Sequence, residues 1–527
     1  MSPIQFSSHV NSRTYYIGEA AYFTRYKRFL LDNVQGWALI MAEVLLTSDR
    51  TLMSNYHNNE FLGFGTCAPP NFIPEAIYSF LFFPPLKNLK GVPVAAPYGL
   101  RKVEAQLLKE GFNVLTVSPD RLGRYIDNAK VLGIYTMDPF GLGPASTTLA
   151  YILKNEPYLA RYFHLLMDSQ TIKRAKTKGL KIIVGGPGAW QFHHRQKFVK
   201  EHGIDCVVDG EADKVVGKLF NSALVGEQLP DCYEVSIEET PALEDIPDIR
   251  NPSVNGLVEI GRGCCRGCRF CNVTLRPLRW YPIEKIQREI ILNLKSGNVE
   301  GCCLHGEDVM LYGSTNTVPN EEKLLQLHDF VAKYCEGISW SHCSLAAVAS
   351  KPKLFSRIAE LIRGKQAWWG AEIGIETGSA ELAKRTMPAK AHPFKAEDWP
   401  EVVHSGLGVM HDNNMVPACT LIVGLPEENE NDVLRTLELI DDIKDFRSLI
   451  VPLFFVPLGK LKREAWFKDE TITDLRRQLL FQCVEHDFRW VDNLLEMSFT
   501  NKWYRQFLRS FYKGFADIAK RKVRQIA

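Results

Sequence analysis

Short apolar runs alternate with helix-like stretches in two blocks of the chain, and this alternation restricts the fold more than any other feature. In the first block, from about residue 90 to 220, the runs are GVPVAAP, FNVLTVS, KVLGIYTM, LKIIVGGPG and CVVDGE. Amphipathic stretches such as LRKVEAQLLKEG lie between them. Strands that alternate with helices form parallel sheets through right-handed crossovers. We therefore predict an α/β protein whose ligands bind at the carboxyl ends of the strands.

The second block begins at LVEIGRGCC and continues to about residue 460. Its runs are LVEIG, GCCLHG, ISWSHCS, AEIGIE, ACTLIVGLP and LIVPLFFVPLG, and six strands with helices between them predict a partial (β/α)6 barrel. Between the blocks, EETPALEDIPDIRNPSVNG is rich in Pro, Asp and Glu, which is typical of a linker. The predicted organisation is an N-terminal extension (1–87), a Rossmann-like sheet domain (88–225), a linker (226–255), the barrel (256–460) and a helical C-terminal region (461–527). Within the extension, YFTRYKRFLLDNVQGWALIMAEVLL has the apolar spacing of a helix.

Composition excludes several classes of protein. The 63 basic and 61 acidic residues give a net charge of +2, which argues against a nucleic-acid-binding protein. The most apolar early stretch, NFIPEAIYSFLFFPPL, is interrupted by prolines and is too short to span a bilayer, and MSPIQFSSHV lacks the features of a signal peptide. We therefore expect a cytoplasmic protein without a membrane span. Its 13 cysteines are then expected to be thiols or metal ligands.

Four cysteines crowd the segment GRGCCRGCRFC, which follows the first run of the second block. A structural zinc site commonly uses two pairs of ligands separated by a longer spacer, and Cys302–Cys303 could supply the second pair. Alternatively, three thiolates at the spacing C-x3-C-x2-C can hold three corners of a cubane iron–sulfur cluster, whose fourth iron stays open. Cys264, Cys268 and Cys271 fit that spacing, which leaves Cys265 as the spare cysteine.

The same segment resembles the radical SAM superfamily, because Phe270 precedes the last cysteine and the loop directly follows the first predicted barrel strand. The resemblance implies a [4Fe–4S] cluster on the three cysteines and S-adenosylmethionine on the open iron. Three later segments, LHGED, GIETGS and TLIVGLPEE, resemble the parts of the family that contact S-adenosylmethionine. The residues that they assign to S-adenosylmethionine are Gly306 and Glu307 (methionine part), Glu376 and Ser379 (ribose) and Gly424 (adenine).

In the first block, VGGPGAW and VVDGEAD resemble the cobalamin-binding domain that accompanies many radical SAM enzymes. A glycine turn would let the backbone approach the ligand, where a side chain would collide. No histidine lies between residues 86 and 163, so a bound cobalt would lack the histidine ligand of the mutase type. Related domains without cobalamin remain the alternative. The residues that this resemblance assigns to cobalamin are Met137, Asp138, Gly143, Ser146, Gly185, Gly186, Pro187, Gly210 and Glu211.

The order of the two blocks, over about residues 88–460, resembles the cobalamin-dependent (class B) radical SAM methyltransferases, in particular archaeal members. The resemblance implies C-methylation of an unactivated sp3 carbon, with electrons from a low-potential donor. A protein residue, such as the glutamine that is methylated in methyl-coenzyme M reductase of methanogens, is the favoured substrate. Ring formation in archaeal tetraether lipids and a non-catalytic cobalamin or cluster sensor are the alternatives. No catalytic residue is assigned from the sequence.

Overall fold

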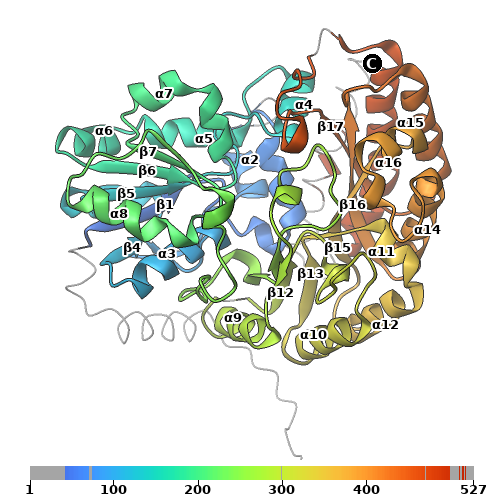
Figure 1. Ribbon diagram of the computed structural model, residues 1–527, viewed down its shortest axis with the longest axis horizontal. Coiled ribbons are helices and arrows are strands. Elements are labelled where there is room, and N and C mark those ends of the chain that lie inside the picture. The colour runs from blue at the N-terminus through green and yellow to red at the C-terminus, as the bar shows by residue number, and fades with distance from the viewer. Residues whose placement is uncertain are drawn as a thin grey trace, which may run out of the picture.

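The computed structural model describes residues 42–70, 74–297, 299–468 and 471–498, together with 510, 513, 514 and 517. Two α/β parts lie side by side, with the first sheet and its helices in one half and the barrel strands with their outer helices in the other (Figure 1). No helix among the described residues is both long and apolar enough to cross a membrane.

The first part contains a six-stranded parallel sheet in the order β4-β1-β5-β6-β7-β8. Its strands are β1 (Val44–Ser48), β4 (Val114–Thr116), β5 (Val131–Tyr135), β6 (Lys181–Gly185), β7 (Cys206–Asp209) and β8 (Cys232–Glu234). The helices of this part are α2 (Glu75–Phe82), α3 (Tyr98–Lys109), α4 (Pro144–Leu153), α5 (Tyr158–Met167), α6 (Gln170–Thr177), α7 (Gln196–Glu201) and α8 (Val216–Leu224). The order of strands reverses at β1 and β5, and doubly wound sheets bind their ligands at such a switch point.

The predicted boundaries of this part are wrong at both ends. Strand β1 lies inside the predicted extension 1–87, and β8 lies inside the predicted linker 226–255. All five residues of β1 are buried, so the strand has no solvent-exposed face, and its apolar run merges with the helical spacing before it. The predicted strand GVPVAAP contributes only Val92–Pro93 (β3), which pairs with Asn88–Leu89 (β2) outside the main sheet. Residues 22–41 of the predicted helix lie outside the described part of the chain.

The predicted partial barrel is confirmed, with each of the six apolar runs forming a strand. The strands are β9 (Leu257–Glu259), β12 (Gly301–His305), β13 (Gly337–Trp340) continued by β14 (His342–Cys343), β15 (Trp369–Glu376), β16 (Met415–Val423) and β17 (Leu449–Phe454). The helices are α9 (Ile283–Ser296), α10 (Glu321–Tyr334), α11 (Leu345–Ser350), α12 (Pro352–Ile362), α13 (Ala380–Thr386), α14 (Trp399–Asp412), α15 (Glu430–Asp442) and α16 (Asp474–Ser498). The antiparallel pair β10 (Gly261–Arg262) and β11 (Arg279–Trp280) ties the base of the cysteine loop.

Buried polar contacts join the two parts. Lys102 of α3 forms an ion pair of 2.6 Å with Glu289 of α9, and the Tyr98 hydroxyl donates to the same carboxylate at 2.7 Å. The side chains of the ion pair are at most 5% exposed, and breaking a buried pair is strongly destabilising. At the barrel's other edge, α4 lies against β17, where the Phe454 amide donates to the Thr148 hydroxyl at 2.8 Å (Figure 1). These contacts fix the sheet and the barrel around the space between them.

Candidate functional site

A cavity of about 890 Å³ lies where the carboxyl ends of the first sheet face the mouth of the barrel. Its volume is that of a pocket for small molecules or cofactors. The sheet wall includes Tyr135, Met137, Pro144, Gly185, Gly186, Pro187, Asp209, Gly210 and Glu211. The barrel wall includes His305, Glu307, His342, Glu372, Glu376, Lys390 and Thr420. The two blocks of the sequence therefore build one shared site.

The cysteine loop completes the barrel wall of this cavity. Cys264, Cys268 and Cys271 line the cavity, whereas Cys265 does not, and its thiol lies 3.8 Å from the carbonyl of Asn316. Burial raises the pKa of the Cys264 thiol to about 12 and raises the pKa of Cys268 and Cys271 as well. The thiols are therefore neutral until a metal displaces their protons. The structure separates the same three cysteines from Cys265 as the spacing argument does.

The alternative zinc site lacks a second pair of ligands near the cysteine loop. Cys302 and Cys303 are buried in β12, and neither lines the cavity. Cys302 is hydrogen-bonded to the thiol of Cys335 instead. A zinc ion held jointly by the cysteine loop and Cys302–Cys303 therefore has no support in this fold.

Arg266 holds the cysteine loop against the barrel. Its buried guanidinium forms an ion pair of 3.1 Å with Asp308 after β12 and donates to the Ser344 hydroxyl at 2.6 Å. It also donates to the backbone carbonyls of Ala389, Lys390 and His392. Several donors of one planar group thus join the loop to three barrel segments. Sequence reasoning missed this residue, although an arginine between cysteines was a signal that the loop needs an anchor.

Two of the residues assigned to S-adenosylmethionine, Glu307 and Glu376, face the cavity. Glu376 has a φ of 66° and accepts from Lys390 Nζ at 2.5 Å and from the Thr420 hydroxyl at 3.2 Å. Burial disfavours the charged ammonium of Lys390, but the Glu376 charge outweighs it, so the pKa of Lys390 is raised. A carboxylate and an ammonium therefore stand together beside the cysteine loop.

Gly306, Ser379 and Gly424 lie outside the cavity wall. The Ser379 hydroxyl accepts from the Leu382 amide at the start of α13 and donates to Asp432 at 2.5 Å, so this serine caps a helix. Gly424 has a φ of +83°, and a Cβ there would lie 1.9 Å from the Phe467 ring. Gly306 donates to the Ser341 hydroxyl at 3.1 Å. These three residues shape the strand ends, and the predicted direct contacts of Ser379 and Gly424 have no support in the geometry.

The residues assigned to cobalamin divide in the same way. Met137, the turn Gly185–Pro187 and the turn Gly210–Glu211 line the cavity, whereas Asp138, Gly143 and Ser146 do not. Asp138 accepts from the Gly143 amide at 3.0 Å and from the Gln191 side chain at 2.6 Å, which fixes the loop after β5. This loop therefore presents Met137 to the cavity and uses its polar residues internally.

The two glycine turns have a requirement for glycine within the chain itself. A Cβ on Gly186 would lie 2.4 Å from the carbonyl oxygen of Thr136, and a Cβ on Gly210 would lie 2.7 Å from the Cβ of Val235. Both glycines also have positive φ, +108° and +126°. The chain itself thus requires glycine at both positions, before any ligand is considered.

Glu211 has partners across the junction of the two parts. Its carboxylate accepts from Arg279 at 2.7 Å and from Arg262 at 3.0 Å, two residues that flank the cysteine loop. Arg262 also pairs with Asp213 at 2.7 Å and with Glu259 at 3.0 Å. The charge of Glu211 is therefore engaged in docking the sheet turn onto the base of the loop.

Sequence reasoning missed an ion pair inside the barrel mouth. His342 of β14 and Glu372 of β15 are register partners, with 3.2 Å between Nε2 and Oε2. Burial works to lower the pKa of His342, but the hydrogen bond and charge of Glu372 outweigh it and raise that pKa to about 9. Both side chains are 35% exposed and line the cavity. A charged imidazolium–carboxylate pair therefore faces the interior space.

The cavity also extends along one face of the first sheet, between α3 and α8. This arm is lined mainly by apolar side chains: Leu46, Val103, Gln106, Gly133, Ile183, Val208, Val216 and Phe220. A Cβ on Gly133 would lie 2.6 Å from Leu46 and 2.9 Å from Phe220, so glycine keeps these side chains in place. The arm can accept an apolar or aromatic group that enters from the shared cavity.

Comparison with known families decides what kind of barrel this is. The model of the Radical SAM superfamily matches residues 258–440, which contain the cysteine loop and the strands from β12 to β16. Residues 258–440 form a radical SAM domain. The predicted recognition of the barrel is thereby confirmed, while the match does not extend to the first sheet.

Curated relatives share the same region at low identity. A tRNA-2-methylthio-N(6)-dimethylallyladenosine synthase of Thermotoga petrophila is 26% identical over 296 residues, which are 55% of this chain and 62% of the relative. An uncharacterized protein of Methanocaldococcus jannaschii is 24% identical over 283 residues, 51% of this chain and 85% of the relative. The chain thus spans about three fifths of the length of the synthases that it matches.

A solved structure resembles both parts of the molecule. The radical S-adenosylmethionine methyltransferase TsrM from Kitasatospora setae, with cobalamin and a [4Fe–4S] cluster bound, has a TM-score of 0.51 and 12% identity, over 80% of this chain and 77% of TsrM. TsrM with tryptophan substrate and a SAM analog gives a TM-score of 0.50. At this identity the similarity shows that the fold is shared.

Proposed function

We propose that this chain is a cobalamin-dependent radical SAM C-methyltransferase that methylates an unactivated sp3 carbon. The observation that carries the proposal is the shared cavity of about 890 Å³, which has three cysteine thiols on one wall and the turns of the first sheet on the opposite wall. A methyl transfer between two cofactors needs both in reach of one substrate atom. TsrM, whose fold is similar, binds cobalamin and a [4Fe–4S] cluster.

The residues of the barrel fit a cluster and S-adenosylmethionine. Cys264, Cys268 and Cys271 supply three thiolates, and Glu307 and Glu376 supply carboxylates that can accept from an ammonium or from hydroxyl groups. Lys390 Nζ holds the Glu376 carboxylate in place through their 2.5 Å contact. When bound, the cluster and S-adenosylmethionine supply a radical that abstracts hydrogen, and cobalamin supplies the methyl group.

The first sheet fits cobalamin in shape. The apolar arm between α3 and α8 can take an aromatic tail, while the turn Gly185–Pro187 and Met137 border the open part of the cavity. Among the residues lining the sheet wall, no histidine is available as a cobalt ligand. The chain's own part in the reaction is thus to exclude water, to position the groups and to hold the substrate.

The charged pair in the barrel favours a polar substrate. An apolar lipid that filled the cavity would cover His342 and Glu372 without giving them hydrogen bonds, which is unfavourable. A side-chain amide can donate to Glu372 and accept from His342 at the same time. We therefore propose a protein residue such as glutamine as the substrate, with methyl-coenzyme M reductase as the specific case, and a low-potential donor as the source of electrons. The carboxylates around the cysteines have no evident use in a non-catalytic sensor.

The test is an anaerobic incubation of the cluster- and cobalamin-loaded chain with S-adenosylmethionine, a reductant and a glutamine peptide. We expect corrin absorbance to stay with the purified protein, and we expect 5′-deoxyadenosine, S-adenosylhomocysteine and a methylated peptide to form together. Corrin binding without either nucleoside product would indicate a sensor. Products without corrin would refute the cobalamin half of the proposal. Zinc held by Cys264, Cys268 and Cys271, with no inorganic sulfide in the protein, would refute all of it.

A further inference from the structure

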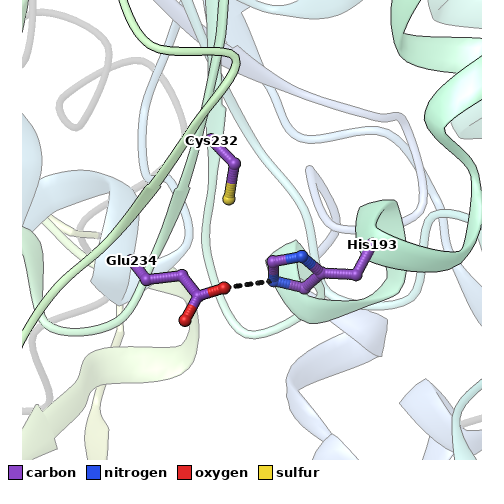
Figure 2. A group of neighbouring side chains, drawn as sticks. All are labelled: His193, Cys232 and Glu234. Carbon is purple, nitrogen blue, oxygen red and sulfur yellow. Dashed lines mark ion pairs between the residues drawn. The ribbon is translucent and has the colours of Figure 1, made fainter.

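A second group of metal-binding side chains lies at the edge of the first sheet, outside the cysteine loop. Figure 2 shows His193, Cys232 and Glu234, whose side chains converge. One ligand atom from each, an imidazole nitrogen, a thiol sulfur and a carboxylate oxygen, lies within 4.8 Å of the other two. No other group of this kind is found among the described residues.

The local fold explains why these residues meet. Cys232 and Glu234 are two positions apart in β8, so their side chains point to the same face of the sheet. On that face, the parallel register places Asp209 of β7 beside Glu234. His193 comes from η5 (Ala189–His194), the short 3-10 helix that follows the glycine turn after β6. Three successive strand ends thus deliver their polar residues to one point.

The contacts of His193 indicate a position for a cation. Its Nε2 lies 3.2 Å from the Asp209 carboxylate and 3.7 Å from the Glu234 carboxylate. One hydrogen on that nitrogen cannot satisfy two carboxylates fully, whereas a divalent ion between the groups can bind all of them.

We infer that His193, Cys232 and Glu234 bind a zinc ion, with Asp209 or a water that it holds in the fourth position. Thiolate, imidazole and carboxylate are the ligands that Zn²⁺ takes, in tetrahedral geometry. Bonds of about 2.0–2.3 Å require the ligand atoms to come within roughly 3.5 Å of one another. The three ligand atoms now lie up to 4.8 Å apart, and rotation of their side chains can bring them to the shorter separation that zinc requires.

The ion would stabilise the end of the sheet. Strand β8 has only three residues and pairs with β7 alone, so it is an edge strand. After it, the chain leaves the sheet and crosses to the barrel at β9. A metal bond from β8 to η5 would fasten this edge next to the turn Gly210–Glu211, which lines the shared cavity. The site is independent of the proposed methyl transfer.

The test uses Co²⁺ as a coloured substitute for zinc, under anaerobic conditions. The full-length chain carries Cys264→Ser, Cys268→Ser and Cys271→Ser, so that the cavity thiols do not contribute. We expect one equivalent of Co²⁺ to produce a thiolate-to-cobalt charge-transfer band and tetrahedral d–d bands, which one equivalent of Zn²⁺ removes. At a free metal concentration of 100 times the Kd, the melting temperature should rise by about 2–3 °C.

Variants in the same background locate the ion. Cys232→Ser should abolish the charge-transfer band, and His193→Gln and Glu234→Gln should weaken binding by about tenfold or more. Cys232→His should keep tight binding but lose the thiolate band, which separates loss of a ligand from loss of the fold. Two control variants should leave Co²⁺ binding and the charge-transfer band unchanged. They are Cys335→Ser, in the buried cysteine pair, and Glu238→Gln, at an exposed acid shortly after β8. An absent thiolate band in the parent, or an unchanged one in Cys232→Ser, would overturn the site.

Discussion

The two walls of the shared cavity, the sheet wall and the barrel wall, differ in the chemical groups that they present. The sheet wall consists mainly of backbone turns and apolar side chains, and its charged residues are paired with neighbours: Lys102 with Glu289, Asp209 with His193, and Glu211 and Asp213 with Arg262. The barrel wall carries titratable side chains that point into the space: His305, Glu307, His342, Glu372, Glu376 and Lys390. A wall of the first kind selects a ligand by shape, and one of the second kind by charge and hydrogen bonds. The sheet wall therefore suits a large preformed cofactor, and the barrel wall suits a reaction in which charge changes.

The largest effect is expected from a substitution that removes a cluster ligand from the barrel wall and leaves the sheet wall intact. Cys268→Ala should abolish the cluster, because two thiolates cannot hold the cubane, and cleavage of S-adenosylmethionine should fall to the uncatalysed background. Corrin binding should persist. Iron and sulfide analysis, corrin absorbance and 5′-deoxyadenosine release measure the three quantities. Cys265→Ala is the matched control, since its thiol lies outside the cavity wall, and it should keep all three. Loss of the cluster in Cys265→Ala would contradict the ligand assignment.

The second prediction concerns the anchor of the charged wall. Arg266→Met should lower the free energy of unfolding by about 3–5 kcal/mol, because the buried Asp308 loses its partner. Denaturant unfolding of the metal-free chain measures this effect. Arg357→Met is the control, because its pair with Glu321 is exposed and should contribute less than about 1 kcal/mol. Combining Arg266→Met with Asp308→Asn should recover part of the loss. Equal effects of the Arg266 and Arg357 variants would show that the barrel charges are not structurally coupled to the loop.

The barrel was predictable from the sequence for a physical reason. Each of its strands is a short apolar run followed by a turn, and the cysteine loop follows the first of them, so local pattern and site coincide. Strand β1 was not predictable in this way. It is buried on all five residues, and a continuous apolar run does not distinguish a buried strand from a helix.

The cavity residues show the same limit. Cys264, Cys268 and Cys271 share one loop, so their spacing alone brings them together. His342 and Glu372 belong to different strands and meet only because the register of β14 and β15 pairs them. Register depends on the closed sheet and cannot be read from one strand. Ser379 belongs to a motif assigned to S-adenosylmethionine, and the structure shows its hydroxyl capping the first turn of α13, a role that the motif does not indicate.

The third prediction tests the sheet wall through its backbone. Gly186→Ala should cost about 1–3 kcal/mol of stability and weaken corrin retention, since a positive φ is combined with a Cβ only 2.4 Å from the Thr136 oxygen. Gly179→Ala has a similar φ of +99° but nothing within 4 Å of its Cβ. It should cost about 1 kcal/mol and leave corrin retention unchanged. Urea unfolding and the corrin-to-protein ratio provide the measurements, and equal retention in both variants would remove the turn from the cofactor wall.

The smallest expected effect is a pH dependence that belongs to the barrel wall alone. The pKa of His342 is raised to about 9 from its ordinary 6.5, so its stabilising contact with Glu372 is fully present below about pH 6.5 and is lost as the pH rises through 9. Glu372, whose pKa is lowered, would lose its contribution only in acid. His305, Glu307 and Asp308 also act on this pair, and they remain in the variant.

Wild type and His342→Gln should therefore differ in stability by on the order of 1 kcal/mol at pH 6.5, after allowance for the partial exposure of the pair. The difference should shrink by pH 9.5, because deprotonation removes the ion pair from the wild type. Urea unfolding at pH 6.5, 8 and 9.5 measures it. His193→Gln, at the edge of the first sheet and outside the cavity wall, is the comparison variant in metal-free protein, since His193 contacts carboxylates near the surface, where an ion pair contributes little. If the stability difference between wild type and His342→Gln did not change with pH, packing of the His342 ring, and not its charge, would stabilise the barrel mouth. The proposed contrast between a sheet wall that selects by shape and a barrel wall that selects by charge would then be wrong.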